Sequence, residues 1–188
     1  MKTYTLLTKE KIMAKWIIDP DHSVAAFRVR HMTVAFVRGQ FNGLHGSLTF
    51  DRNHLPAFAL EFTIEAAGIH TGIAKRDAHL KSADFFDVAK YPELLFKSRD
   101  FTPDNSGGRL TGDLTMHGVK KPVTLELTIS GPVKSPEDLG GETVVGITAT
   151  AVLNREDFGL RWNVPLGEDA MMIGNEIAIS LDIEADRE

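Results

Sequence analysis

The sequence of 188 residues contains no cysteine. Disulfide bonds, thiol catalysis and cysteine-ligated zinc or iron–sulfur centres are therefore excluded. It also contains no run of eighteen apolar residues, so no segment is expected to span a membrane as a helix. Basic residues are not in excess, because 21 Lys and Arg against 26 Asp and Glu give a formal net charge of −5. Nucleic acid is not an expected partner, since phosphate binding needs a basic patch.

Sequence motifs for catalysis and metal binding are missing as well. Seven histidines are present, but no two have the His-x-His or His-x-x-x-His spacing that would bring two imidazoles to one metal ion. There is no Gly-x-Ser-x-Gly nucleophile elbow, and the glycine-rich turns lack the strand–turn–helix context of a phosphate-binding loop. We predict a protein that is not an enzyme, with no catalytic residue, no cofactor and no metal site.

The sequence is instead rich in period-two alternation of apolar and polar residues, which is typical of antiparallel strands with one buried face. About eight such segments are present; they lie at 22–31, 41–50, 57–66, 94–101, 109–117, 123–130, 143–153 and 177–184. Turn residues separate them, including Asp19-Pro20-Asp21, Arg38-Gly39 and the stretch 103–108. Short connections between strands favour an all-β up-and-down barrel or sandwich.

One segment, 73–87, departs from this alternation and combines charged, imidazole and aromatic side chains. We predict it to be the one short helical insertion, with Ser82 capping a final turn. No linker divides the chain, so residues 13–188 are expected to form a single domain and residues 1–12 a flexible N-terminal extension. This start is too weakly apolar for a secretory signal, which predicts a cytoplasmic protein.

Alternation alone does not decide whether such a barrel is packed or hollow. Strands of about ten residues rise roughly 33 Å, which is long for a small barrel. The apolar faces are also more extensive than one short helix could cover from outside. Eight strands leave room either for filling side chains or for one small ligand, and both interpretations stay open here.

Several motifs in order resemble those of the YceI-like family, the polyisoprenoid-binding proteins with a lipocalin-like barrel. The resemblance covers about residues 16–185, and its motifs are Asp19-Pro20-Asp21-His22-Ser23, Phe27-Arg28-Val29-Arg30-His31, Val37-Arg38-Gly39-Gln40-Phe41, residues 76–87, Tyr91-Pro92, residues 114–123 and residues 154–159. It implies an extended eight-stranded antiparallel barrel whose pore holds a long isoprenoid, such as a quinone or polyprenyl phosphate, or a similar lipid. It also implies a homodimer. Many members are periplasmic, whereas this sequence shows no signal peptide.

The alternation places a set of apolar side chains on the inward face of the barrel. Those expected to line a lipid tail are Phe27, Val29, Phe62, Ile64, Leu114, Ile147 and Ile179. His31 ends one of these inward rows and is expected either to be a hydrogen-bonded residue of the rim or to contact a ligand head group. Either way it needs a polar partner, because an unpaired buried polar group costs a few kcal/mol.

The helical insertion carries the other candidates for ligand binding. Arg76 and His79 lie three residues apart on one helix face, with Asp77 rotated away. They either form a local network that holds the insertion on the barrel or meet a head group such as a phosphate, which suits arginine. Phe85 and Phe86 either anchor the insertion or guard the entrance. Trp162 either covers one barrel end or stacks on a polyprenyl tail.

The leading hypothesis is non-catalytic binding, sequestration or transport of a long isoprenoid or similar amphiphilic lipid. One alternative is a structural or stress-response module with a filled barrel, in which Arg28 and Arg30 could serve a dimer contact. Another is an enzyme acting on a hydrophobic substrate. That alternative would need a polar pair deep within the apolar rows, where the pattern offers only His31 near one end.

Overall fold

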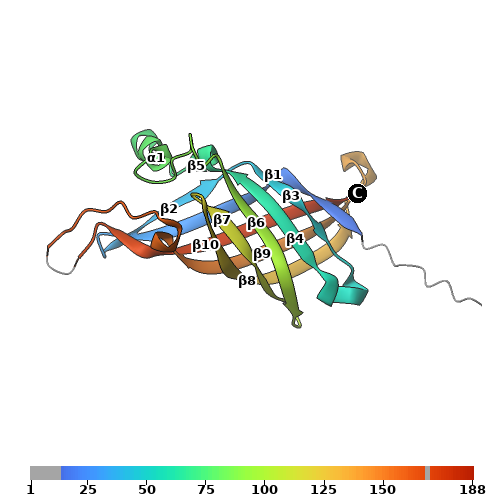
Figure 1. The fold of residues 1–188 in the computed structure, drawn as a ribbon. Helices are drawn as coiled ribbons and strands as arrows, with labels where there is room; N and C mark the ends of the chain where they lie inside the picture. The colour runs from blue at the N-terminus through green and yellow to red at the C-terminus, as the bar shows by residue number, and fades with distance from the viewer. Residues whose placement is uncertain (1–13, 168–169) are drawn as a thin grey trace, which may run out of the picture.

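A computed structural model describes residues 14–167 and 170–188, so the expected extension over residues 1–12 lies outside the described residues. The described part is built mainly of strands and has one α-helix, α1 (Ala74–Lys81) (Figure 1). The strands are β1 (Lys15–His31), β2 (Ala35–Phe41), β3 (Leu44–Thr49), β4 (Ala59–Glu65), β5 (Ile69–His70), β6 (Glu93–Pro103), β7 (Gly107–Met116), β8 (Val119–Lys134), β9 (Thr143–Asn154) and β10 (Ile173–Arg187). Short 3₁₀ turns lie at Arg52–Ala57, Ala66–Gly68, Glu137–Leu139 and Arg155–Phe158.

The strands form one sheet that closes on itself. They follow the order β10-β9-β8-β7-β6-β4-β3-β1, and β1 also pairs with β10. Of the ten strands in the described sheet, β2 and β5 lie outside this ring, which leaves eight in it. Every pair in the ring is antiparallel. The predicted all-β fold, an eight-stranded antiparallel barrel with one helix, is confirmed.

Strand β1 is long enough to pair with different strands at its two ends. Its first residues, Lys15 to Ile17, pair with β3, whereas Ala25 to His31 pair with β2. Between them the register against β10 shifts from Asp19 to Val24, and the Asp21 amide donates a 2.8 Å hydrogen bond to the Asp19 carboxylate. The turn predicted at Asp19-Pro20-Asp21 is therefore a bulge within a continuous strand, where the chain bends from one partner to the other.

The turn predicted at Arg38-Gly39 is wrong, because both residues lie inside β2. The hairpin turns earlier, at Met32 and Thr33, whose φ angles are 51° and 63°. Gly39 sits opposite Phe27 in the β1–β2 ladder. A Cβ there would lie 2.5 Å from the Phe27 ring, so packing, and not a turn, requires this glycine.

The helix predicted at 73–87 is shorter than expected. α1 ends at Lys81 because the Ser82 backbone is extended and the Ser82 hydroxyl donates to the His79 carbonyl at 2.8 Å. The same hydroxyl accepts from the Asp84 amide at 3.3 Å, as expected for a residue that begins a new turn. Residues 82–87 therefore continue as turns that bring two phenylalanines back towards the barrel.

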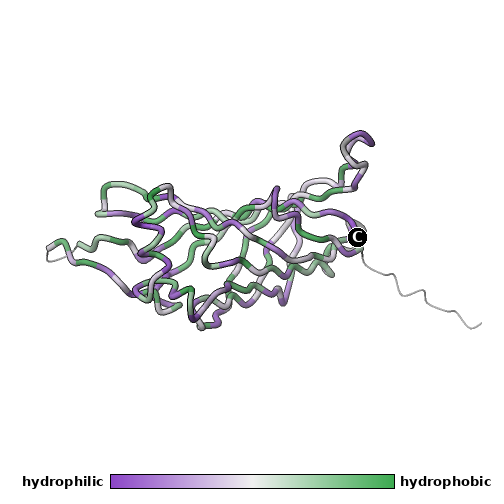
Figure 2. Tube along the Cα trace, turned by 90° about the horizontal axis from the view of Figure 1, so that it is seen from above, coloured by the Kyte–Doolittle hydropathy of each residue, from purple (hydrophilic) through white to green (hydrophobic). Residues whose placement is uncertain are grey.

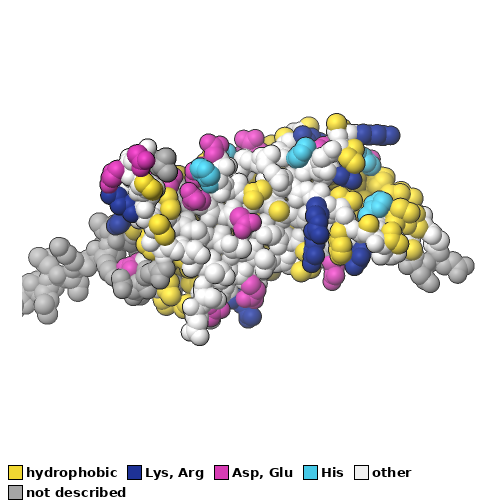
Figure 3. All heavy atoms as spheres, turned by 180° about the vertical axis from the view of Figure 1, so that it is seen from behind, with side chains coloured by type: hydrophobic (Ala, Val, Ile, Leu, Met, Phe, Trp, Pro, Cys, Tyr) yellow, Lys and Arg dark blue, Asp and Glu magenta, His cyan; other side chains and the backbone are white. Residues whose placement is uncertain are grey.

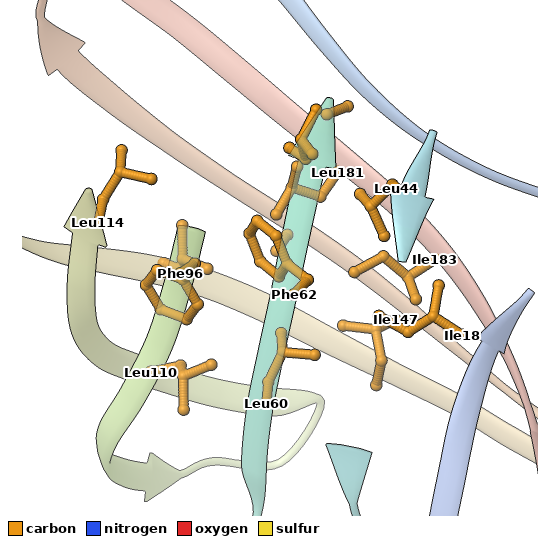
Figure 4. Packing of buried hydrophobic residues seen from close by; sticks show 14 of the residues in the cluster. Ile18, Leu44, Leu60, Phe62, Phe96, Leu110, Leu114, Ile147, Leu181 and Ile183 are labelled. Carbon is orange, nitrogen blue, oxygen red and sulfur yellow. The ribbon is translucent and has the colours of Figure 1, made fainter. Parts of the chain in front are cut away.

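The alternating hydropathy of the strands, visible along the chain in Figure 2, places apolar side chains inside the ring. One half of the interior is solidly packed, with Leu44, Leu48, Leu60, Leu110, Val145 and Ile147 at most 1% exposed. Aromatic rings close the end of this half, in the contacts Trp16–Phe50, Phe50–Phe58 and Phe58–Phe101. In Figure 4, Leu60 and Leu110 lie on one side of Phe62 and Phe96, and Leu114 and Leu181 lie on the other.

Candidate functional site

The other half of the barrel interior is hollow. It contains a cavity of about 290 Å³, close to the lower end of the range for small-molecule sites. Strands of the sheet supply most of its wall, with lining residues from each described strand except β3. The wall is completed by α1, the turn after it, the segment 155–162 and Met172. Phe62 and Phe96 stack with ring centroids 5.1 Å apart and form its floor. The question of a packed or a hollow barrel is thus answered differently for the two halves.

The structure brings together nearly all of the residues that the sequence singled out as ligand-binding. Those that line the cavity are Phe27, Val29, His31, Phe62, Ile64, Arg76, His79, Phe85, Phe86, Leu114, Trp162 and Ile179. Ile147 does not line it, although it faces inward, because its position along β9 places it in the packed half with 1% exposure. The ligand-binding role of each residue stays a prediction.

A hydrogen-bonded network fixes α1 over the mouth of the cavity. The Asp77 carboxylate accepts from the Thr71 amide at 2.9 Å and from the Thr71 hydroxyl. Arg76 donates through Nε to the Thr71 hydroxyl at 2.7 Å and through Nη2 to the Thr71 carbonyl at 2.8 Å. The bond from the Thr71 hydroxyl is the main reason why the pKa of Asp77 lies below its ordinary value. This geometry matches the local network expected for the insertion, while Arg76 also borders the cavity.

His79 links the helix to a cluster of aromatic rings at the mouth. Its Nε2 lies 2.8 Å from the Asp84 carboxylate. Its ring meets Phe85 and Trp162 edge-on, with centroids 5.0 and 4.7 Å away. Since Phe85 and Trp162 also touch each other at 5.2 Å, the three rings form one side of the opening. Trp162 covers one side of the mouth while still facing the cavity.

Arg155 is a cavity residue that the sequence analysis did not single out. Its side chain is 3% exposed. It donates to the backbone carbonyls of Gly174, Leu160 and Trp162, and to the Asn175 side chain. Burial lowers the pKa of this guanidinium, and the charge of Glu156 opposes this shift. The motif Asn154-Arg155-Glu156 was visible in the sequence, but nothing in it distinguishes a buried arginine from a surface one.

The ionisable side chains on the cavity wall share one sign of charge. They are Arg30, His31, Arg76, His79 and Arg155, and no aspartate or glutamate lies among the described lining residues. The cavity surface itself is almost entirely apolar, so the charged atoms of these side chains lie at its border and scarcely reach into it. Such a cavity can hold an apolar chain and present positive charge to whatever group remains at the opening.

A second cluster of titratable groups lies outside the cavity. Donor atoms of Asp19, His22 and Glu184 lie within 4.8 Å of one another, although the sequence predicted no metal site. The 2.6 Å contact between His22 Nδ1 and the Asp19 carboxylate accounts for part of this closeness. That hydrogen bond lowers the pKa of Asp19 and raises the pKa of His22. The absence of a metal site stays a prediction.

Comparison with known proteins places this geometry in a family. Residues 16–185 match the family model for the YceI-like domain. A UPF0312 protein of Pseudomonas putida strain GB-1 is 38% identical over 165 residues, which cover 85% of this chain and 83% of that protein. The YceI protein of Campylobacter jejuni is similar in structure, with a TM-score of 0.71, 26% identity, and coverage of 100% of this chain and 99% of that one.

A third protein is similar in fold alone. It is a polyisoprenoid-binding domain from Saccharophagus degradans, implicated in plant cell wall breakdown. Its TM-score is 0.69 at 14% identity, and the match covers 94% of this chain and 99% of that domain. Among the described residues of this chain, the only α-helix has eight residues, and no helix is long and apolar enough to cross a membrane.

Proposed function

The chain belongs to the YceI-like family, and we propose from this premise that it binds a long isoprenoid or similar amphiphilic lipid without transforming it chemically. The observation that carries the proposal is the half-hollow barrel, whose cavity wall is almost entirely apolar. A lipid tail in this cavity would gain about 25 cal/mol for each Å² of apolar surface removed from water. The polyisoprenoid-binding name of the similar Saccharophagus degradans domain supports the same class of ligand.

The charge of the mouth favours a particular class of head group. Three arginines and two histidines border the cavity, and Arg155 is buried among carbonyl groups. An anionic head, such as a phosphate or carboxylate, would lower the electrostatic cost of that buried cation. We therefore infer that an anionic amphiphile binds more tightly than an uncharged one with the same tail.

An enzyme is disfavoured by the distribution of polar groups. Acid–base or nucleophilic chemistry on a bound tail would need a reactive pair deep in the cavity. The floor consists of Phe62 and Phe96, and the nearest imidazoles belong to the mouth. His79 at the mouth is hydrogen-bonded to Asp84. This contact is consistent with a structural role for His79 in holding the mouth of the cavity in place.

The first test is organic extraction of the purified protein followed by mass spectrometry. We expect a long-chain lipid in a near-stoichiometric amount. The delipidated protein should then bind both geranylgeranyl phosphate and geranylgeraniol in a fluorescence titration, and the phosphate more tightly. If extraction yields no lipid and neither compound binds, the alternative of a module without a ligand replaces this proposal.

A matched pair of substitutions separates binding from stability. Ala25 lines the cavity, whereas Ala149 is buried but does not line it. We expect Ala25→Leu to fill cavity space and weaken lipid binding at least tenfold, at little cost to folding. Ala149→Leu should instead destabilise the fold by about 1–3 kcal/mol through overpacking, with lipid affinity retained. Equal affinities for Ala25→Leu and the wild type would contradict tail binding in this cavity.

A further inference from the structure

Large apolar side chains are exposed around the mouth of the cavity. Met32, Val34 and Phe36, in and after the β1–β2 turn, are 43%, 80% and 42% exposed. Ile73, just before α1, is 53% exposed, and Met171, just before β10, is 50% exposed. We call these five residues the apolar rim. Figure 3 shows hydrophobic side chains gathered at this end of the molecule, on the right of the view.

Two of the three chain segments that carry the apolar rim form one projecting edge. The Met32 amide donates a 2.8 Å hydrogen bond to the Met172 carbonyl, and β1 pairs with β10 as far as His31 and Ile173. In Figure 1, the β1–β2 hairpin and the segment before β10 extend together beyond the body of the barrel. His31 and Met172 also line the cavity, so the rim is continuous with its opening.

The rim is accompanied by positive charge in a chain whose formal net charge is −5. Residues 28–38 contain three arginines and no acidic residue. Two of them stack on a rim aromatic, with the guanidinium carbons of Arg28 and Arg30 5.1 and 3.9 Å from the Phe36 ring centroid. In the sequence, Lys75 lies two residues after Ile73, and Arg161 lies one residue before the cavity residue Trp162. The acidic residues Glu168 and Asp169 lie outside the described residues. In the view of Figure 3, acidic side chains lie mainly over the opposite half.

Apolar side chains next to arginines are the combination that binds the interface of an anionic bilayer. The apolar groups enter the boundary of head groups and acyl chains, and the cations attract the anionic head groups. A second copy of this chain fits the surface less well. A two-fold contact of rim against rim would place the arginines of one copy close to those of the other.

We propose that the apolar rim docks the mouth of the barrel onto the surface of an anionic lipid bilayer. In this orientation the cavity opens towards the membrane, so an amphiphile can pass between the bilayer and the barrel without crossing water. The proposal rests on the proposed function, because docking of the mouth has this consequence only if the cavity holds a lipid.

The test is co-sedimentation of the full chain with vesicles of phosphatidylcholine alone or mixed with 30% phosphatidylglycerol. We expect binding to the anionic vesicles, much weaker binding to the neutral ones, and a loss of binding as salt is raised. The double variant Met32→Glu/Val34→Glu should bind anionic vesicles at least tenfold more weakly. Val133, in β8 and 61% exposed, is a matched control outside the rim, and Val133→Glu should bind like the wild type.

Loading with geranylgeranyl phosphate from detergent solution separates docking from lipid binding. The rim variant is expected to load as the wild type does, which also shows that it is folded. Anionic-vesicle binding by the rim variant equal to that of the wild type would overturn the proposal. The proposal would also be overturned if the wild type does not bind vesicles and instead forms a dimer, measured by analytical ultracentrifugation, that the rim variant does not form. A wild type that docks through the rim but takes up no lipid would refute the proposed function alone.

Discussion

At position 39 only a hydrogen atom fits between two neighbouring side chains. A Cβ would lie 2.5 Å from the Phe27 ring and 2.7 Å from the Thr71 methyl group. Phe27 forms part of the cavity wall, and Thr71 holds Asp77 and Arg76 of α1. A side chain at position 39 would therefore disturb both the cavity wall and the attachment of α1, which covers the cavity.

We predict that Gly39→Ala destabilises the protein by about 1–3 kcal/mol, because the added methyl group must displace a ring and the Thr71 side chain. Gly146 in β9 is the control, since its nearest contact for a Cβ is Ser130 at 3.6 Å. Gly146→Ala should leave stability unchanged or raise it slightly. Urea denaturation of both variants measures the difference, and equal midpoints would contradict the packing role of Gly39.

Arg155 is a buried charge that borders the cavity. Its charge is nearly fully buried, yet its side chain donates to three backbone carbonyls and an amide oxygen. Those partners come from positions 160–175, a stretch without the alternation seen in the strands. Local sequence therefore gave no sign that this arginine, among many charged residues, would border a cavity.

At the scale of elements, α1 depends on interactions with the strand before it more than on helix propensity. A helix of eight residues is marginal by itself. Asp77 accepts two hydrogen bonds from Thr71, and His70 lies 3.3 Å from the same carboxylate. The cover of the cavity is thus tied to the short strand β5 and the residue after it by the Asp77 carboxylate.

The lowered pKa of Asp77 gives this cover a dependence on pH. A carboxyl group whose pKa is lower in the folded state stabilises that state above the ordinary value of 3.8, and the contribution is lost as pH falls through the folded pKa. We predict that Asp77→Asn raises the rate of amide hydrogen exchange in α1 and at Thr71 at pH 7. The difference from wild type should shrink once the pH is below 3.8.

The exposed Asp100 in β6 supplies a control for this experiment. Asp100→Asn also removes one negative charge and should leave exchange in α1 as it is in the wild type. Exchange rates in α1 that are the same in wild type and Asp77→Asn at pH 7 would show that the carboxylate does not hold the helix in place.

At the scale of the whole molecule, the barrel is divided into a packed half and a hollow half by its own topology. Where β1 pairs with β3 the ring is filled by leucines and closed by aromatic rings. Where β1 pairs with β2, the sheet continues into β5, and the helix and the segment before β10 complete the wall. Buried contacts in the packed half stabilise the fold. The hollow half therefore does not need the same dense packing for the protein to fold.

This division predicts uneven local stability. Amides of β8 and β9 beside Leu127 and Ile147, which are buried and do not line the cavity, should exchange slowly. Those of β2 and β5 should exchange faster, because fewer buried contacts hold them. Bound geranylgeranyl phosphate should slow exchange mainly in β2, β5 and α1. At a free lipid concentration of 100 times Kd it should stabilise the fold by about 2.7 kcal/mol. If bound lipid slowed amide exchange equally in both halves of the barrel, the division into a packed half and a hollow half would be contradicted.

The sequence by itself determined the fold class and most of the candidate cavity residues, because a period of two assigns each strand residue to one face. Closing the sheet then sends those faces inward, as for Phe62 and Leu114. Tertiary structure alone decided how deep each inward residue lies, since depth depends on strand register and not on the period. Ile147 and Phe62 have the same alternation, yet one is packed and the other faces the cavity. Arg155, Met32 and Met171 lie outside the strands, and only tertiary contacts place them. Arg155 donates to the Gly174 carbonyl at the start of β10, and the Met32 amide donates to the carbonyl of Met172, next to Met171.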